Sequence, residues 1–170
     1  MTETDGRIRR AVPDDDVAIV TVSTRTWRVA YTGVVPQHVL DQLDASEERV
    51  RFQHELLERS DVHAFVAEVG GCTVGFATAG PDRGSLPSCG EIYALYVLPE
   101  HWSTGLGRTL ATAAFGALRG DGFERVGLWV LEDNPRARRF YVACGLALTG
   151  ERQMLDIGGP LPEVRYGGIL

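Results

Sequence analysis

The chain has 170 residues, with 17 Lys and Arg against 23 Asp and Glu, and a formal net charge of −6 at pH 7. This length predicts a single domain over residues 1–170, large enough to bury a core without a metal or disulfide bonds. The acidic balance excludes a duplex nucleic-acid partner, which requires clustered cations, and it favours an amine substrate.

The sequence also carries no sign of export or of a membrane anchor. No segment approaches eighteen consecutive apolar residues, and residues 1–6 lack the basic patch and apolar run of a secretion signal. The three cysteines are odd in number and widely spaced, which favours reduced thiols. We therefore expect a soluble cytoplasmic protein with no membrane partner. The four histidines lack metal-ligand spacing, so we expect no metal.

The first sixty residues predict one short strand followed by three helices. Residues 8–12 form the strand, and the aspartates within 13–16 cap a helix over 17–30. Pro36 begins a second, short helix, and Ser46 caps a third. These helices precede the strands that build the main sheet.

The middle of the chain predicts a hairpin, a central strand and a helix. Gly70-Gly71 joins two β-rich runs between residues 63 and 79 as a tight antiparallel hairpin. Residues 90–97 are apolar on both faces, as expected for a strand that is covered on two sides. The helix over 106–119 carries one apolar stripe.

The last third alternates strand and helix. Residues 125–130 predict a strand and residues 135–144 a helix, so the central strands should be parallel neighbours. Two strand-like stretches, 152–157 and 163–166, flank Gly158-Gly159 and are expected to close the sheet as an antiparallel hairpin.

Gly105 and Gly107 lie between the strand over 90–97 and the following helix. Glycine has no Cβ, so this loop can approach an anion closely, and the first turn of the helix offers free amides and a positive dipole end. The pattern predicts a phosphate-binding loop, with Arg108 able to add charge. An ordinary tight turn is the alternative for two glycines alone.

Two common nucleotide motifs do not fit this loop. A dinucleotide fingerprint belongs to the first strand-helix unit, whereas this loop follows several strands and helices. A P-loop requires Lys followed by Ser or Thr, and this chain has Arg108-Thr109.

A second motif runs from Asn134 to Leu146. Asn134 and Tyr141 are seven residues apart, almost two helical turns, so they point along one side about 10 Å apart. This geometry suits an extended, rod-like ligand, whereas Phe140 is expected to be a core aromatic.

Taken together, these motifs resemble the GNAT superfamily of N-acetyltransferases, which transfer acetyl from acetyl-CoA to an amine. The resemblance spans nearly the whole chain and rests on residues 91–97, 102–108 and 134–146. It implies an α/β fold in which helices flank a mixed, mostly antiparallel sheet, with two central parallel strands splayed apart to hold acetyl-CoA. The chain departs from the family at Trp102, where Gln or Arg is usual, so we expect altered loop packing.

The resemblance also implies roles for individual residues. Tyr141 matches the general acid for the departing thiolate, and Glu91 matches a catalytic carboxylate, with Glu132 or a water relay as the alternative base. A β-bulge in the strand that holds residues 95–97 is implied as well. The residues implied to bind acetyl-CoA are Leu95, Tyr96, Val97, Trp102, Ser103, Thr104, Gly105, Leu106, Gly107, Arg108, Asn134 and Ala137.

Residues 26–36 are similar to the substrate-side helical segment of bacterial members, including polyamine-type acetyltransferases. This similarity implies a small-molecule amine bound near Trp27 and Tyr31. Two alternatives stay open: transfer to a protein N-terminus or lysine, and a non-catalytic acyl-CoA sensor. The resemblance is also compatible with a homodimer.

Overall fold

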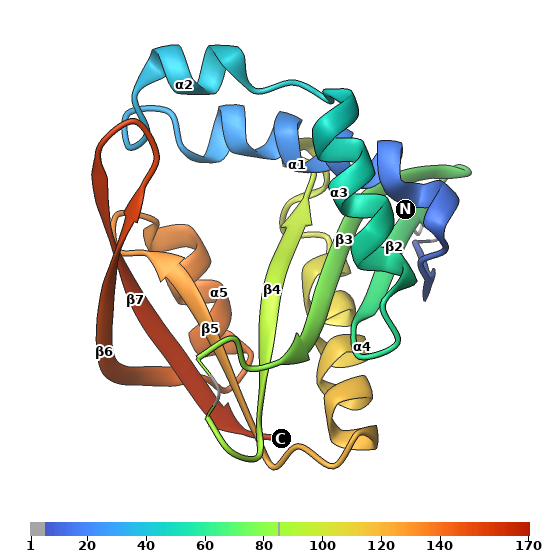
Figure 1. Cartoon of the computed structure of the whole chain (residues 1–170), viewed down its shortest axis with the longest axis vertical. Coiled ribbons are helices and arrows are strands. Elements are labelled where there is room, and N and C mark those ends of the chain that lie inside the picture. Colours follow the sequence, from blue (N-terminus) through green and yellow to red (C-terminus); the bar gives the residue numbers. More distant parts are fainter. Residues whose placement is uncertain (1–5, 85) are drawn as a thin grey trace.

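The chain folds around a seven-stranded sheet with helices on both faces (Figure 1). The computed structural model describes residues 6–84 and 86–170, so the expectation about residues 1–6 lies, apart from Gly6, outside the described residues. The strands are β1 (Arg7–Arg10), β2 (His63–Val69), β3 (Cys72–Pro81), β4 (Cys89–Val97), β5 (Arg125–Leu131), β6 (Ala147–Asp156) and β7 (Pro160–Ile169). The helices are α1 (Asp16–Ala30), α2 (Gln37–Gln42), α3 (Glu47–Glu58), α4 (Leu106–Gly120) and α5 (Pro135–Ala143), with 3₁₀ turns η1 (Pro13–Asp15) and η2 (Pro99–His101). None of these helices is long and apolar enough to cross a membrane.

The strand order is β1-β2-β3-β4-β5-β7-β6, and every neighbouring pair is antiparallel except β4 and β5. This confirms the expected α/β class and the mixed, mostly antiparallel sheet. The tail hairpin inserts its second strand, β7, between β5 and β6. Both strands are longer than predicted, because β6 continues past an irregularity at 148–152 whose polar, glycine-containing sequence resembles a loop.

Helices α1 and α3 cover one face of the sheet and α4 covers the other (Figure 1). Ser46 caps α3 as predicted, since its Oγ accepts a hydrogen bond from the Arg49 amide at 3.5 Å. The predicted acidic cap of α1 is wrong for Asp15. Its carboxylate instead accepts hydrogen bonds from the Arg9 guanidinium at 2.7 and 2.8 Å, because β1 places that arginine beside it.

Strands β4 and β5 pair along a short stretch and then diverge. Their register contains three pairs, Cys89 with Arg125, Gly90 with Val126 and Glu91 with Gly127. Beyond Glu91, β4 has no β5 partner, and the two strands separate toward α1 (Figure 1). This confirms the expected splayed parallel pair and leaves main-chain groups of β4 free to meet a ligand.

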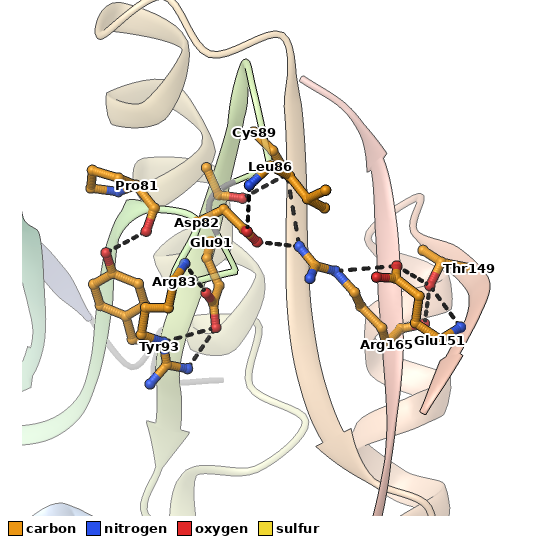
Figure 2. Close-up of polar contacts among 11 residues, drawn as sticks. Pro81, Asp82, Arg83, Leu86, Cys89, Glu91, Tyr93, Thr149, Glu151 and Arg165 are labelled. Carbon is orange, nitrogen blue, oxygen red and sulfur yellow. Dashed lines mark hydrogen bonds and ion pairs between the residues drawn. The ribbon is translucent and has the colours of Figure 1, made fainter. Parts of the chain in front are cut away.

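A buried ion pair connects the two halves of the sheet where they meet (Figure 2). The Arg165 guanidinium on β7 reaches across β5 to Asp82, and both residues are buried. Gly127 makes the crossing possible, because a Cβ there would lie 2.6 Å from Arg165 Nη2. Asp82 Oδ2 also accepts a hydrogen bond from the Leu86 amide at 3.1 Å, so the pair orders the β3–β4 loop as well.

We expect Asp82→Asn to lower the free energy of unfolding by about 3 kcal/mol, because the buried Arg165 would keep only the half-exposed Glu151, at 3.6 Å, as a counter-ion. Urea titration measures this loss. The matched control, Glu132→Gln, breaks the more exposed pair with Arg152 and should cost less than about 1 kcal/mol. Equal losses in the two variants would contradict a special role for the buried pair.

Candidate active site

The loop between β4 and α4 presents a run of free main-chain N–H groups. Within the described chain, the amides of residues 103–108 find no hydrogen-bond acceptor, whereas the amides of Trp102 and Thr109 bond to the Pro99 and Gly105 carbonyls. Ser103 at φ 63° and Gly105 at φ 93° adopt left-handed backbone, a conformation that forms anion-binding concavities. The loop therefore fits a diphosphate group such as the one in acetyl-CoA.

A cavity of about 280 Å³ adjoins this loop and lies between β4 and α5. Nine of the twelve residues predicted to bind acetyl-CoA line it, and so does Tyr141; the nine are Leu95, Tyr96, Val97, Trp102, Ser103, Gly105, Gly107, Arg108 and Ala137. The other three lie elsewhere. Leu106 is in the core, Asn134 lines a neighbouring cavity, and the Thr104 hydroxyl donates to the His101 carbonyl. We name this the donor cavity.

Trp102 forms a platform at the start of the loop. Its Nε1 donates to the Val97 carbonyl at 2.7 Å, and the guanidinium carbon of Arg136 lies 3.4 Å from the centre of its ring system. Arg136 has no hydrogen-bond or ion-pair partner among residues 6–84 and 86–170, and burial lowers its pKa. A cation thus stacks on Trp102 in the wall of the donor cavity, with its N–H donors available to an anion.

Two polar contacts fix helix α5 beside the loop. The Asn134 Oδ1 accepts a hydrogen bond from the Ala137 amide at 3.0 Å and caps the first turn. At the other end, Arg108 Nη2 donates to the Ala143 carbonyl at 2.7 Å. Arg108 therefore ties α4 to α5 while it also lines the donor cavity.

Tyr141 lies where two cavities meet. It lines the donor cavity and a second cavity of about 250 Å³, which we name the acceptor cavity. No hydrogen-bond partner for its hydroxyl is found in the described part of the chain, and burial raises the pKa of the phenol well above 10. Tyr141 therefore stays protonated at neutral pH and can donate a proton or a hydrogen bond to a group in either cavity.

The acceptor cavity is bounded by α1, β4, β5, α5 and the β6–β7 hairpin. Trp27 and Tyr31, the predicted substrate residues, both line it, and their ring centroids are 4.6 Å apart. Burial raises the pKa of Tyr31 and that of Tyr96, which lines both cavities. Glu163 on β7 supplies the one carboxylate among its lining residues.

Glu91, the predicted catalytic carboxylate, is 1 % exposed but lines neither cavity. Figure 2 shows it held by Arg83: Oε1 accepts from Nη2 at 2.5 Å and from Nε at 3.1 Å, and Oε2 accepts from the Arg83 amide at 2.8 Å. The hydrogen bond with Glu91 raises the pKa of Arg83. Glu132, the alternative base, pairs with Arg152 and also lies outside both cavities.

The bulge implied for β4 lies at Tyr93. Ile92 pairs with Ala79 and Ala94 with Thr78, so Tyr93 has no opposite residue on β3. The bulge is therefore just N-terminal to residues 95–97. It turns Tyr93 into the wall of the acceptor cavity.

Sequence reasoning missed two site residues, Arg136 and Glu163. Arg136 belongs to an arginine-rich helix turn that resembles a solvated surface, and Glu163 is a single acid in a strand, one of 23 Asp and Glu in the chain. Neither has a local pattern that reveals its position in a cavity wall. In residues 6–84 and 86–170 there is no group of three His, Cys, Asp or Glu that could hold a metal ion.

The sequence matches the model of the Acetyltransferase (GNAT) family over residues 25–146. It is 33 % identical, over 94 % of this chain and 91 % of the relative, to the uncharacterized N-acetyltransferase YuaI of Bacillus subtilis (strain 168). The family-model match and the identity to this relative assign the chain to the family from sequence alone.

Solved structures share the same fold. The PaiA N-acetyltransferase from Thermoplasma acidophilum, in complex with coenzyme A, has a TM-score of 0.76 at 18 % identity and covers 98 % of this chain and 99 % of its own. YncA from Salmonella typhimurium, with its cofactor acetyl-CoA, has a TM-score of 0.74 at 20 % identity and covers 97 % and 94 %. The chain described here belongs to the acetyltransferase (GNAT) family and is an acetyl-CoA-dependent N-acetyltransferase.

Proposed function

We propose that the acetyl group is transferred to the primary amine of a small molecule. The observation that carries this proposal is the closure of the acceptor cavity on its outer side. Tyr31, Val35, Leu40 and Leu131 form a separate apolar cluster, with residues of the β6–β7 hairpin packed against it. Because α2 and the hairpin tip pack together, side chains of the described residues cover this side of the acceptor cavity, which favours a small acceptor over an extended polypeptide.

The donor side is proposed to hold acetyl-CoA by its diphosphate. The free amides of residues 103–108 bind the phosphate oxygens, and Arg136 adds a positive charge from the stack on Trp102. The free edge of β4 beyond Glu91 binds the arm that follows the diphosphate. When bound, acetyl-CoA supplies an acetyl group activated as a thioester.

Two residues are proposed to manage the protons of the reaction. An aliphatic amine is neutral in only about one molecule in a few thousand at pH 7, so a base must assist its deprotonation. Glu163 is positioned for this role, directly or through water, since it lines the acceptor cavity. Tyr141 Oη donates its proton at the sulfur, so a C–N bond replaces the C–S bond and the proton lost by the amine balances the one gained by the thiol.

Thiol release from acetyl-CoA tests the proposal, with an acceptor panel of small monoamines, diamines, spermidine, amino acids, aminoglycosides and N-terminal or lysine peptides. We expect turnover with small amines and little with peptides. Spermidine tests the polyamine-type resemblance directly. Turnover with peptides alone would support a protein acetyltransferase, and binding of acetyl-CoA without turnover of any acceptor would support a sensor.

Tyr141→Phe should lower kcat about a hundredfold or more while the Kd for coenzyme A stays within about twofold, because the ring remains and the proton donor is lost. Stopped-flow or steady-state thiol release gives kcat, and calorimetry gives the Kd. An unchanged kcat would remove Tyr141 from the reaction.

Gly107→Val should raise the Kd for coenzyme A about tenfold or more. A Cβ at this position would lie 3.3 Å from Phe140 Cε2, so the added methyl groups would occupy the floor of the donor cavity. Gly116→Val on the same helix is the matched control, because its Cβ would meet nothing within 4 Å. A similar Kd for the two variants would mean that the valine acts through helix propensity.

Substitution should distinguish the two candidate bases, Glu163 and Glu91. We expect Glu163→Gln to lower kcat/KM about tenfold or more near pH 7 and to lose less at pH 9, where more of the amine is already neutral. Glu91→Gln should instead lower the melting temperature, since the buried side chain would lose charge-assisted hydrogen bonds from the Arg83 guanidinium and amide. The reverse pattern would restore Glu91 as the base.

A further inference from the structure

A third cavity lies beside the acceptor cavity, on the face of the sheet that α1 and α3 cover. Its volume is about 680 Å³, and its walls come from α1, α3, β3 and β4. Ile19, Leu56 and Phe76 supply apolar lining, and Phe52 lines it while remaining 66 % exposed. We name it the α3 cavity.

The α3 cavity and the acceptor cavity share part of their walls. Four residues line both cavities: Arg83, Tyr93, Ala94 and Tyr96. A molecule whose amine occupies the acceptor cavity would therefore extend past Tyr93 and Tyr96 into the α3 cavity.

Gln53, a residue of the cavity lining, has a side-chain hydrogen-bond donor without an acceptor among the described residues. The residue is 9 % exposed and lines the cavity, although more apolar neighbours on α3 such as Phe52 stay exposed. Its Nε2 is fully buried and is the one such side-chain N or O atom without a hydrogen-bond partner in residues 6–84 and 86–170. A buried amide without an acceptor costs stability, so this nitrogen is suited to an acceptor that a ligand brings.

Arg49 places a positive charge one helical turn before Gln53. Residues four apart on a helix lie on one face, with Cβ atoms about 6 Å apart. Arg49 Nη1 donates to Thr24 Oγ1 at 2.7 Å and to the Asp44 carbonyl, but no carboxylate oxygen of the described residues lies within 4.0 Å of its guanidinium. Burial lowers its pKa, and the charge of Asp44 offsets this only in part.

The remaining charges of the α3 cavity are already compensated or exposed. Arg59 pairs with Asp61, Arg83 with Glu91 and Asp82 with Arg165. Glu48 lines the cavity from an exposed position on α3. The groups left incompletely paired within the described chain are therefore the half-buried Arg49 guanidinium, which has no carboxylate within 4.0 Å, and the buried Gln53 amide, which has no acceptor; together they match a carboxylate.

We propose that the acceptor is an amine that carries a carboxylate at its far end, bound by Arg49 and Gln53 in the α3 cavity. This proposal rests on the proposed transfer to a small-molecule amine. A second ammonium group would face a cation and a hydrogen-bond donor in the α3 cavity, so diamines are disfavoured.

The proposal can be tested by comparing how fast the wild-type enzyme acetylates acceptors of equal length that differ at their far end. Straight-chain ω-amino acids of four to eight carbons are compared with the diamines and monoamines of the same lengths, by thiol release from acetyl-CoA. We expect the best ω-amino acid to exceed its matched diamine and monoamine about tenfold in kcat/KM. Equal or better turnover of diamines or monoamines would overturn the carboxylate proposal and leave the small-amine function standing. If no small amine is acetylated, both proposals fail.

Substitutions on α3 test whether Gln53 is responsible for the preference for ω-amino acids. Gln53→Leu should raise KM for the ω-amino acid about tenfold, leave the monoamine unchanged and raise the melting temperature by about 3 °C, because a buried N–H without an acceptor is removed. Gln53→Glu should raise the same KM further by placing a negative charge against the carboxylate. Arg51→Gln, an exposed arginine of α3 outside the cavity, is the control and should change neither substrate. Equal effects of Gln53→Leu on both substrates would show that the residue does not contact the carboxylate.

Discussion

The short contact between β4 and β5 is the constraint on which the structure depends. Three residue pairs join the parallel strands, and beyond Glu91 the ladder stops. The protein thereby leaves strand hydrogen bonds unmade in the middle of its sheet, where they are usually satisfied. The Arg165–Asp82 pair, passing over Gly127, holds the two halves together at the closed end (Figure 2). At the open end, the β4–α4 loop and α5 form the walls of the donor cavity.

The two sides of this opening have different electrostatic character. On the α4 side, free amides and the Arg136 guanidinium offer positive potential to a phosphate-bearing donor, although the whole chain is acidic. On the α1 side, aromatic rings and Glu163 surround the place where an amine would react. Tyr141 is shared by both, and burial keeps its phenol protonated. In the proposed function, the fold thus separates a site for an anionic carrier from a site for a cationic acceptor.

Local patterns made most of the fold predictable. The Gly70-Gly71 turn and the apolar stripe of α4 specify their elements through backbone freedom and periodicity, which act over a few residues. The glycine-containing loop before α4 was predictable for the same reason, whereas the role proposed for Tyr141 came from family resemblance. Contacts between distant positions were not predictable. Neither the capture of Asp15 by Arg9 nor the position of Glu163 in a cavity wall follows from neighbouring residues.

Because of the gap between β4 and β5, the stability of the fold should also depend on whether the donor is bound. A donor bound between the strands supplies contacts that a continuous sheet would have made for itself, so it binds the native chain and not the unfolded one. By mass action, a ligand at a hundred times its Kd adds about 2.7 kcal/mol to the free energy of unfolding. When the thioester pool falls, the same molecules open more often and become better substrates for proteases.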